Sequence, residues 1–243
     1  MSPPVFVVAA DRLSAGTVLV DGSEGRHAAT VVRLRVGDPV VLTDGHGRRG
    51  DGAVATVGRN LVEVTVASVV ATPGPALRLV VVQALPKGDR GAMAVEVMTE
   101  MGVDVIVPWA AARCVMRWRD GRAEKALTRW RTSVLAASKQ SRRTRFPEVA
   151  ELASTSDVCQ LLEAAAVGVV LHEAATESLA RLPVPSSGDV VLVVGPEGGV
   201  SPEEVAAFRD AGAPAYRLGD TVLRTSTAGT AALAVVLAQT RWR

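Results

Sequence analysis

The sequence predicts an α/β protein with a small β domain over residues 1–72 and a larger α/β domain over residues 73–243. Up to residue 70, short apolar segments are separated by turn residues, as in all-β domains. From Leu77 onward, apolar strand-like segments alternate with segments of helical periodicity. Hydrophobic residues make up 48% of the chain and aromatic residues only 3%. A core rich in valine and alanine suits parallel strands that helices cover on both faces.

In the first part, the pattern predicts five short strands, over residues 5–8, 17–20, 39–42, 52–57 and 61–66. The segments between them contain turn pairs such as Asp21-Gly22 and Asp44-Gly45. At least one helical turn is expected over Glu24–Val32. Five strands and one helix indicate a compact barrel, and residues 71–75, with two prolines, are typical of a linker.

In the second part, strands are expected over residues 79–84, 105–109, 168–171, 190–194 and 216–218. Helices are expected over residues 89–101, 123–140, 157–166 and 226–240. A further helix should begin at Ser201-Pro202, since serine is a good N-cap and proline suits the first helical position. In the first of these helices, Met93, Val97 and Met101 share one stripe. Met93, Met98 and Met101 are expected in the core.

Two loops have the composition of a ligand-binding site. Gly195–Gly199 and Leu218–Ala228 each follow an apolar strand and precede a helix, about 25 residues apart. Glycine lets a ligand approach the backbone closely. Neither the dinucleotide fingerprint nor the phosphate-loop motif is present, so a small ligand read by shape is expected. The alternative for each loop is an ordinary strand-to-helix turn.

The charge distribution indicates a polyanion as partner, although the net charge is only +2. Residues 113–145 hold 11 Lys/Arg against two acids, whereas residues 146–243 hold 12 acids against six bases. Arginine dominates the basic segment, and its guanidinium suits phosphate. Nucleic acid is therefore the expected partner, and a solvated helix face is the alternative.

Cysteine and histidine usage argues against a metal site or a disulfide framework. Cys114 and Cys159 stand alone, and the three histidines are scattered. The first residues do not have the pattern of a secretion signal, and no apolar run is long enough for a membrane helix. A cytoplasmic protein without metal is expected.

The order and spacing of seven motifs resemble one family, the 16S ribosomal RNA uridine-N3 methyltransferases of the SPOUT superfamily. The motifs are Lys87-Gly88-Asp89-Arg90, Thr99–Asp104, Ala112-Arg113-Cys114, Lys139–Arg143, Leu171-His172-Glu173, Gly195–Gly199 and Leu218–Ala228. The resemblance covers nearly the full length. It implies an N-terminal PUA-like RNA-binding β-barrel and a C-terminal α/β methyltransferase domain with a deep trefoil knot. It also implies S-adenosyl-L-methionine as cofactor, 16S rRNA of the 30S subunit as substrate, and a homodimer.

The resemblance also assigns roles to residues of this chain. For catalysis we expect a cation that stabilises the negative charge of the uracil, first Arg224, because it lies on a cofactor loop, and second Arg143. The alternative for Arg224 is a helix-capping surface residue. For the cofactor the resemblance implies Leu171, His172, Glu173, Gly195, Pro196, Glu197, Gly198, Gly199, Leu218, Gly219, Val222, Leu223 and Thr225. For RNA contacts we expect Arg33, Arg35, Arg113, Arg117, Gln140, Arg142 and Arg145. Glu173 is a candidate general base, and contact with the ribose or solvent is the alternative.

Four positions depart from the common family pattern. Lys139 and Ser226 stand where many members have glutamate, Arg142 where many have glycine, and Val97 where lysine is common. Two other functions remain alternatives, a methyltransferase for a transfer-RNA ribose or another rRNA base, and an RNA-binding module without catalysis. The full-length match argues against another RNA target, and the intact glycine loops argue against a module without catalysis.

Overall fold

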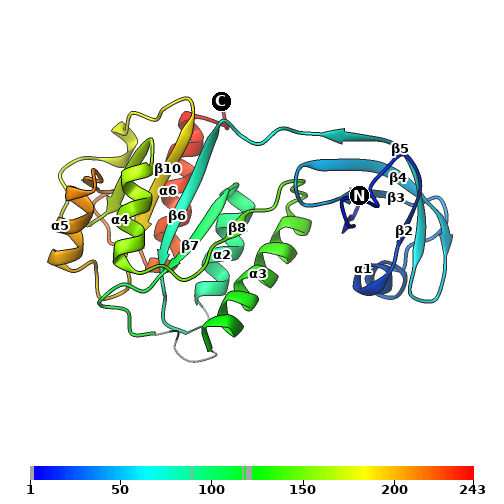
Figure 1. Cartoon of the computed structure of the whole chain (residues 1–243), viewed down its shortest axis with the longest axis horizontal. Coiled ribbons are helices and arrows are strands. Elements are labelled where there is room, and N and C mark those ends of the chain that lie inside the picture. Colours follow the sequence, from blue (N-terminus) through cyan, green and yellow to red (C-terminus); the bar gives the residue numbers. More distant parts are fainter. Residues whose placement is uncertain (1–2, 89, 117, 119–121) are drawn as a thin grey trace. The chain divides into compact units, whose positions relative to one another are not determined.

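The computed structural model describes residues 3–243 except 89, 117 and 119–121. These residues form two compact units (Figure 1). The first consists of the chain up to Gly74 together with Ser138–Phe146, and the second of Pro75–Ala137 and Pro147–Arg243. The predicted domains, residues 1–72 and 73–243, stay a prediction. They differ from the two compact units in that Ser138–Phe146 was expected in the second domain.

The first unit is built on one five-stranded sheet with the order β1-β3-β4-β5-β2. Its strands are β1 (Val5–Val7), β2 (Gly16–Val20), β3 (Pro39–Thr43), β4 (Arg48–Val57) and β5 (Val62–Ala71). β1 pairs with β3 in parallel, and the other pairs are antiparallel. The predicted helical turn is present as α1 (Gly22–Arg26), which continues into the π-helix η1 (His27–Val32).

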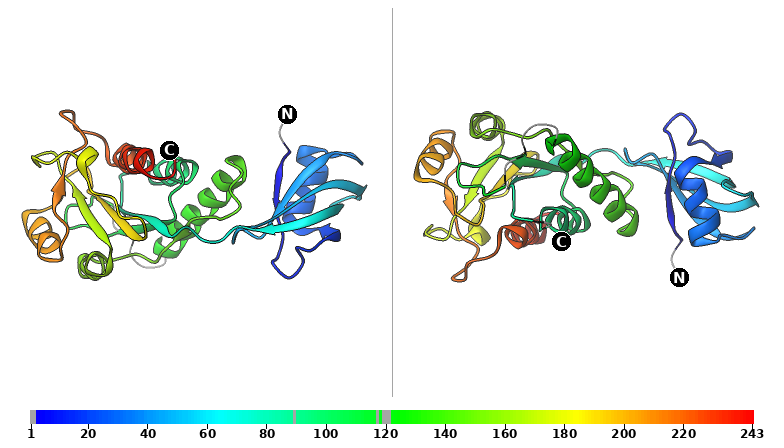
Figure 2. Two further views of the ribbon diagram at one scale, coloured as in Figure 1. Left: turned by 90° about the horizontal axis from the view of Figure 1, so that it is seen from above. Right: turned by 90° about the horizontal axis from the view of Figure 1, so that it is seen from below.

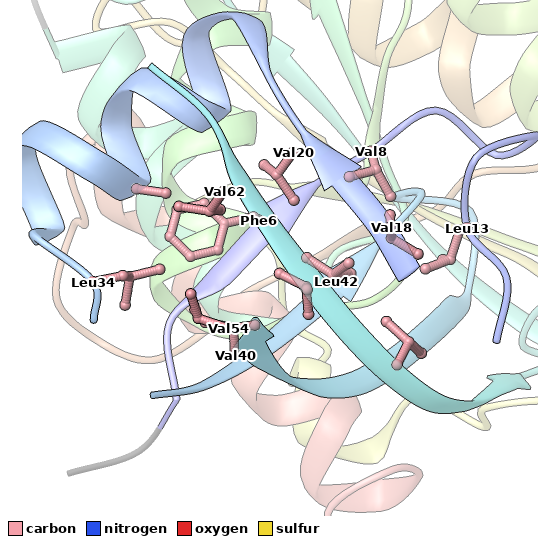
Figure 3. Packing of buried hydrophobic residues seen from close by; sticks show 13 residues of the cluster. Phe6, Val8, Leu13, Val18, Val20, Leu34, Val40, Leu42, Val54 and Val62 are labelled. Atoms are coloured by element: carbon pink, nitrogen blue, oxygen red, sulfur yellow. The ribbon is translucent and has the colours of Figure 1, made fainter. Parts of the chain in front are cut away.

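The core of this unit is aliphatic, with one aromatic ring. Phe6 of β1 lies among Val20, Leu34, Val54 and Val62 (Figure 3). Phe6 and Val62 are at most 1% exposed. Inward valines alternate with polar residues along β5, which is the period-2 pattern that a strand with one buried face requires.

Ser138–Phe146 completes the first unit although it is distant in sequence. The carbonyl of Thr144 accepts hydrogen bonds from Gly47 N at 2.9 Å and from the Thr43 hydroxyl at 3.1 Å. Phe146 N donates to the Gly45 carbonyl at 2.8 Å. A Cβ on Gly45 would lie 3.0 Å from the Phe146 ring, and its φ of +75° also favours glycine. Phe146 therefore anchors this segment on the sheet.

Lys139 is fixed in the same unit by a half-buried ion pair. Its Nζ lies 2.7 Å and 2.8 Å from the two carboxylate oxygens of Glu24, and 5.6 Å from the centroid of the Phe6 ring. Glu24 also accepts a hydrogen bond from Val7 N at 3.0 Å. The side chains of Lys139 and Glu24 are 18% and 19% exposed. The lysine that departs from the family pattern thus has a structural partner in α1.

Replacing Lys139 by alanine is expected to lower the stability of the first unit by about 2 kcal/mol, because the Glu24 carboxylate would remain half-buried without its cation. Hydrogen exchange of the β1 and β3 amides in the full chain measures this loss. Lys125→Ala, at an exposed position of the same helix, is the matched control. Equal protection in both variants would contradict the role of the ion pair.

The second unit contains a six-stranded, fully parallel sheet with the order β11-β9-β10-β6-β7-β8. Its strands are β6 (Leu77–Ala84), β7 (Val105–Trp109), β8 (Glu148–Val149), β9 (Val167–Leu171), β10 (Gly188–Val194) and β11 (Ala215–Tyr216). Its helices are α2 (Arg90–Met101), α3 (Arg122–Gln140, whose end belongs to the first unit), α4 (Thr155–Ala164), α5 (Pro202–Asp210), α6 (Thr225–Gln239) and the 3-10 turn η2 (Leu179–Arg181). Figure 2 shows α2 and α6 together on one face of the sheet, and α4 and α5 on the other.

The helix capping predicted at Ser201 is confirmed. Ser201 is the N-cap of α5, Pro202 opens the helix, and Ser201 and Glu204 form a reciprocal capping box. The expectation that Met93 lies in the core is wrong, because Met93 is 47% exposed. The expected burial of Met98 is confirmed, and Met98 shares the buried face of α2 with Ala94 and Val95. α2 packs against α6.

Arg241, near the carboxyl end of the chain, contacts the first residue of β6 and the segment before β7. Arg241 donates to the carbonyls of Leu77 and Gly102 and forms an ion pair with Asp104. Asp104 in turn accepts a hydrogen bond from Leu79 N at 2.7 Å.

In the described part of the chain, none of the helices has both the length and the apolar character needed to cross a membrane.

Candidate functional site

Three loops meet at the carboxyl edge of the parallel sheet in the second unit. In the strand register, Leu171 at the end of β9 is opposite both Val194 of β10 and Tyr216 of β11. The segments that follow these three residues therefore leave the sheet side by side. Between them lies a pocket of about 300 Å³. The ends of adjacent parallel strands are where α/β proteins bind ligands.

The first wall of the pocket is the glycine loop, Gly195–Gly199. It closes as a turn in which Gly199 N donates to the Pro196 carbonyl at 2.9 Å, and Gly199 has a φ of +72°. A Cβ on Gly195 would lie only 2.7 Å from Cγ2 of Val200. The loop therefore requires glycine for conformation at one end and for space at the other. The Glu197 carboxylate accepts a hydrogen bond from Lys87 N at 3.1 Å, which ties the loop to the segment after β6.

The second wall is the Arg224 loop, residues 217–225. Arg217 pairs with Asp220 at 3.1 Å near its start. Arg224 is the N-cap residue of α6, but its side chain makes no capping hydrogen bond and is exposed. The following Thr225 is 5% exposed, and its carbonyl accepts a hydrogen bond from Gln83 Nε2 at 3.3 Å. The backbone on one side of Arg224 is therefore fixed, while its guanidinium remains available to a ligand.

The third wall is Leu171-His172-Glu173. His172 N donates to the Tyr216 carbonyl at 2.9 Å, and His172 Nδ1 accepts from Ala174 N at 3.2 Å. The first bond holds the backbone of this short segment against β11, and the second fixes the turn after His172. Glu173 is exposed and lines both the main pocket and a neighbouring hollow.

The structure gathers nearly all the residues expected to bind the cofactor around these two hollows. The main pocket is lined by Leu171, Glu173, Gly195, Pro196, Glu197, Gly199, Val222, Leu223, Arg224 and Thr225. The neighbouring hollow adds His172, Leu218 and Gly219. Gly198 lines neither and instead contacts Arg113. Ala228, the last residue of the predicted Leu218–Ala228 loop, also lines the pocket. The sequence reasoning missed Val194 and Val200, which line it as well. Both directly adjoin the predicted glycine loop, and that adjacency was the available signal.

The residues expected to bind RNA lie in both units. Arg33, Arg35, Gln140 and Arg142 belong to the first unit and are exposed. Arg145, also in that unit, donates to the Thr72 carbonyl at 3.0 Å. Arg113 belongs to the second unit. Arg117 lies outside the described residues.

Arg143, the second expected catalytic cation, belongs to the first unit, whereas Arg224 belongs to the second. The Nε of Arg143 donates to the Arg145 carbonyl at 3.0 Å, which fixes the direction of its side chain.

Two arginines of the first unit have unusual backbone conformations. Arg33, at the end of η1, has φ = 58°, and Arg142, just after α3, has φ = 59°. Among the described residues, these are the two non-glycine residues in the left-handed region. For Arg142 this explains the glycine that is common in the family, because the residue after a helix often adopts this conformation and glycine does so without steric strain.

The cysteines do not offer a nucleophile for this site. Burial raises the pKa of the Cys114 thiol, and it also raises that of Cys159. Both are free cysteines and are therefore protonated near neutral pH. Among the residues that the structure describes, no cluster of His, Cys, Asp and Glu could hold a metal ion.

Comparison with known proteins gives consistent matches along the chain. A family model described as RNA methyltransferase domain matches residues 73–237, and one described as RNA methyltransferase PUA domain matches residues 20–67. A Mycobacterium bovis protein named ribosomal RNA small subunit methyltransferase E is 47% identical over 229 residues, which cover 92% of this chain and 87% of that protein. A Bacillus subtilis protein of the same name is 27% identical over 93% of this chain and 91% of its own length.

Solved structures resemble the fold along nearly the whole chain. A ribosomal RNA small subunit methyltransferase E from Neisseria gonorrhoeae, bound to S-adenosyl methionine, has a TM-score of 0.86 and 27% identity, with 98% of each chain covered. A structure from Legionella pneumophila, described with the bound cofactor SAM, has a TM-score of 0.87 and 26% identity, also with 98% of each chain covered.

Proposed function

We propose that this chain methylates N3 of a uridine in 16S rRNA with S-adenosylmethionine. The chain belongs to the RNA methyltransferase family, and its relatives from Mycobacterium bovis and Bacillus subtilis are named ribosomal RNA small subunit methyltransferase E. The observation that carries the proposal is the pocket at the carboxyl edge of the sheet. It brings together three loops that are separate in sequence and places Arg224 on its lining.

The lining of the pocket fits this cofactor. Leu171, Val194, Val200 and Leu223 offer apolar surface for an adenine ring, and the glycine loop lets a ligand approach the backbone. Glu173 supplies a carboxylate that can accept hydrogen bonds from ribose hydroxyls. When bound, the cofactor supplies an electrophilic methyl group on a sulfonium sulfur.

Arg224 is assigned to the acceptor base. A uridine N3 keeps its imide proton at neutral pH, and transfer of that proton to solvent water leaves negative charge on the ring oxygens. A guanidinium beside these oxygens stabilises the anion and so favours attack by N3. Arg143 is the second cation assigned to this role. The remaining acceleration comes from holding N3 in line with the methyl carbon and sulfur.

Arg33 and Arg142 are assigned to the phosphates of the RNA. A long side chain in the left-handed region is less stable than glycine by about 1 kcal/mol. Backbone strain of this kind concentrates at functional sites. Both residues are exposed, and both carry the charge that a polyanion requires. Arg35 and Gln140, exposed two residues away from them, extend the same surface segments.

Replacing Arg33 and Arg142 by glycine is therefore expected to change stability and RNA binding in opposite directions. The double variant should gain about 1–2 kcal/mol of stability, because the left-handed strain is relieved. Its salt dependence of RNA affinity should become shallower by about one to two in log–log slope. Urea unfolding and filter binding at several salt concentrations measure the two effects. Arg59→Ala, at an exposed turn, is the charge control, and an unchanged slope in the double variant would remove both arginines from the interface.

The finer features of the fold belong to the same proposal. We assign the first unit a PUA-like barrel and the second a deep trefoil knot. The match to solved RNA methyltransferase structures along nearly the whole chain supports this assignment. A homodimer is supported by the exposed apolar side chains of Met93 and Trp242, and light scattering measures it. The ribosomal substrate implies a cytoplasmic location.

Calorimetry with S-adenosylhomocysteine and an acceptor assay test this function together. The proposal predicts cofactor binding and labelled methyl transfer to small subunits or 16S rRNA, with no transfer to transfer RNA. Binding without transfer to either ribosomal acceptor would indicate another RNA target. Absence of binding would indicate an RNA-binding module without catalysis.

A further inference from the structure

Arg113 lies on a turn that leaves the sheet beside the glycine loop. The turn spans Ala111–Cys114 and is closed by a hydrogen bond from Cys114 N to the Ala111 carbonyl at 3.1 Å. It follows β7, whose last residue, Trp109, is opposite Ala84 of β6. Since the neighbouring Gln83 is opposite Val194 of β10, the turn and the glycine loop emerge at the same edge.

The side chain of Arg113 lies directly against Gly198. Its Nη1 donates a hydrogen bond to the Gly198 carbonyl at 3.2 Å. A Cβ on Gly198 would lie 3.2 Å from both the Cβ and the carbonyl oxygen of Arg113. Such contacts are tighter than a Cβ ordinarily makes, so glycine at position 198 is what allows Arg113 to approach.

A buried carboxylate fixes the turn that carries Arg113. Glu204 of α5 is 4% exposed and accepts hydrogen bonds from Ala112 N at 2.7 Å and from the Thr155 hydroxyl at 3.2 Å. It also accepts one from Ser201 N at 3.0 Å, at the residue that follows the glycine loop and Val200. The same carboxylate therefore sets both the backbone beside Arg113 and the start of α5.

The opposite side of the glycine loop is held by Glu197, whose carboxylate accepts a hydrogen bond from Lys87 N. The loop is thus held at Glu197 from the β6 side and at Gly198 from the β7 side. The hydrogen bond from Arg113 to the Gly198 carbonyl opposes rotation of the peptide group between Gly198 and Gly199. Gly199 has φ = +72°. That peptide is part of the wall of the pocket through Gly199.

We propose that Arg113 is a positioning residue for the glycine loop, which acts on cofactor affinity through the Gly198 carbonyl, and that it is not a phosphate ligand for RNA. The inference rests on the proposed function, because it takes the pocket to be the S-adenosylmethionine site. It replaces the RNA role that the sequence analysis expected for this arginine.

Two substitutions separate these roles. Arg113→Met keeps an unbranched apolar stem against Gly198 but removes the donor and the charge. Arg113→Lys keeps a donor and the charge. We expect the dissociation constant of S-adenosylhomocysteine, measured by calorimetry, to rise about fivefold in the methionine variant, as for the loss of one hydrogen bond. The lysine variant should stay within about twofold of the wild type, and the RNA affinity and its salt slope should be unchanged in both.

Arg142→Gly is the matched control with the opposite expectation, weaker RNA binding and unchanged cofactor affinity. If Arg113→Met weakened RNA binding and left cofactor affinity intact, the RNA role would be correct and the inference wrong. If the methionine and lysine variants both bound cofactor like the wild type, the inference would also fail. If the wild type did not bind S-adenosylhomocysteine, the proposed function itself would fail.

Discussion

Replacing Arg224 by alanine is expected to slow methyl transfer at least about 100-fold, the scale seen when one donor to a developing oxyanion is removed. The affinity for S-adenosylhomocysteine should stay within about twofold. Arg224 starts α6 without capping it, so the helix does not need its side chain. The loss should therefore fall on the chemical step rather than on folding or cofactor binding.

Single-turnover transfer from bound cofactor is the appropriate measurement, because it excludes product release. Arg209→Ala is the matched control, since Arg209 is an exposed arginine on α5 that pairs with Asp210 and does not line the pocket. Full single-turnover activity in Arg224→Ala would remove Arg224 from catalysis. Arg143→Ala would then become the variant to compare.

The substitution Gly195→Ala is expected to weaken binding of S-adenosylhomocysteine about 30-fold. The added Cβ would lie 2.7 Å from Cγ2 of Val200, which is 5% exposed and itself lines the pocket. Overpacking of this kind costs about 1–3 kcal/mol, and 2 kcal/mol corresponds to about 30-fold in affinity. Because Val200 is β-branched, it has few alternative rotamers with which to move away.

A second substitution tests the cause of this loss. Adding Val200→Ala to Gly195→Ala removes the colliding methyl group, and it should restore most of the affinity. Val200→Ala alone is the control, and it should lose only the modest contact of its own side chain. Calorimetry on the four proteins of this double-mutant cycle measures the coupling. Additive losses would show that the collision with Val200 is not the reason for the glycine.

Local signals were sufficient to predict much of the fold. The strand and helix pattern from Leu77 onward follows from periodicity, and Ser201-Pro202 sets the start of α5 because capping is a short-range interaction. The glycine and Arg224 loops were predicted to face one ligand, and the parallel register of β9, β10 and β11 brings them together. In these cases the information lies within a few residues of the feature.

The remaining features depend on contacts between distant segments. Nothing near Lys139 in sequence indicates Glu24, which lies 115 residues away, or the place of Ser138–Phe146 in the first unit. The contact between Arg113 and Gly198 spans 85 residues. Met93 shows the limit of periodicity, because a stripe predicts which residues share a face and not which face is covered.

Nucleoside mass spectrometry of small ribosomal subunits that lack the modification, after incubation with this protein and labelled S-adenosylmethionine, tests the central claim most directly. The account predicts that the label appears in 3-methyluridine, and that Arg224→Ala reduces it at least about 100-fold. Label in a different nucleoside, or unlabelled RNA although the protein binds S-adenosylhomocysteine, would contradict the account.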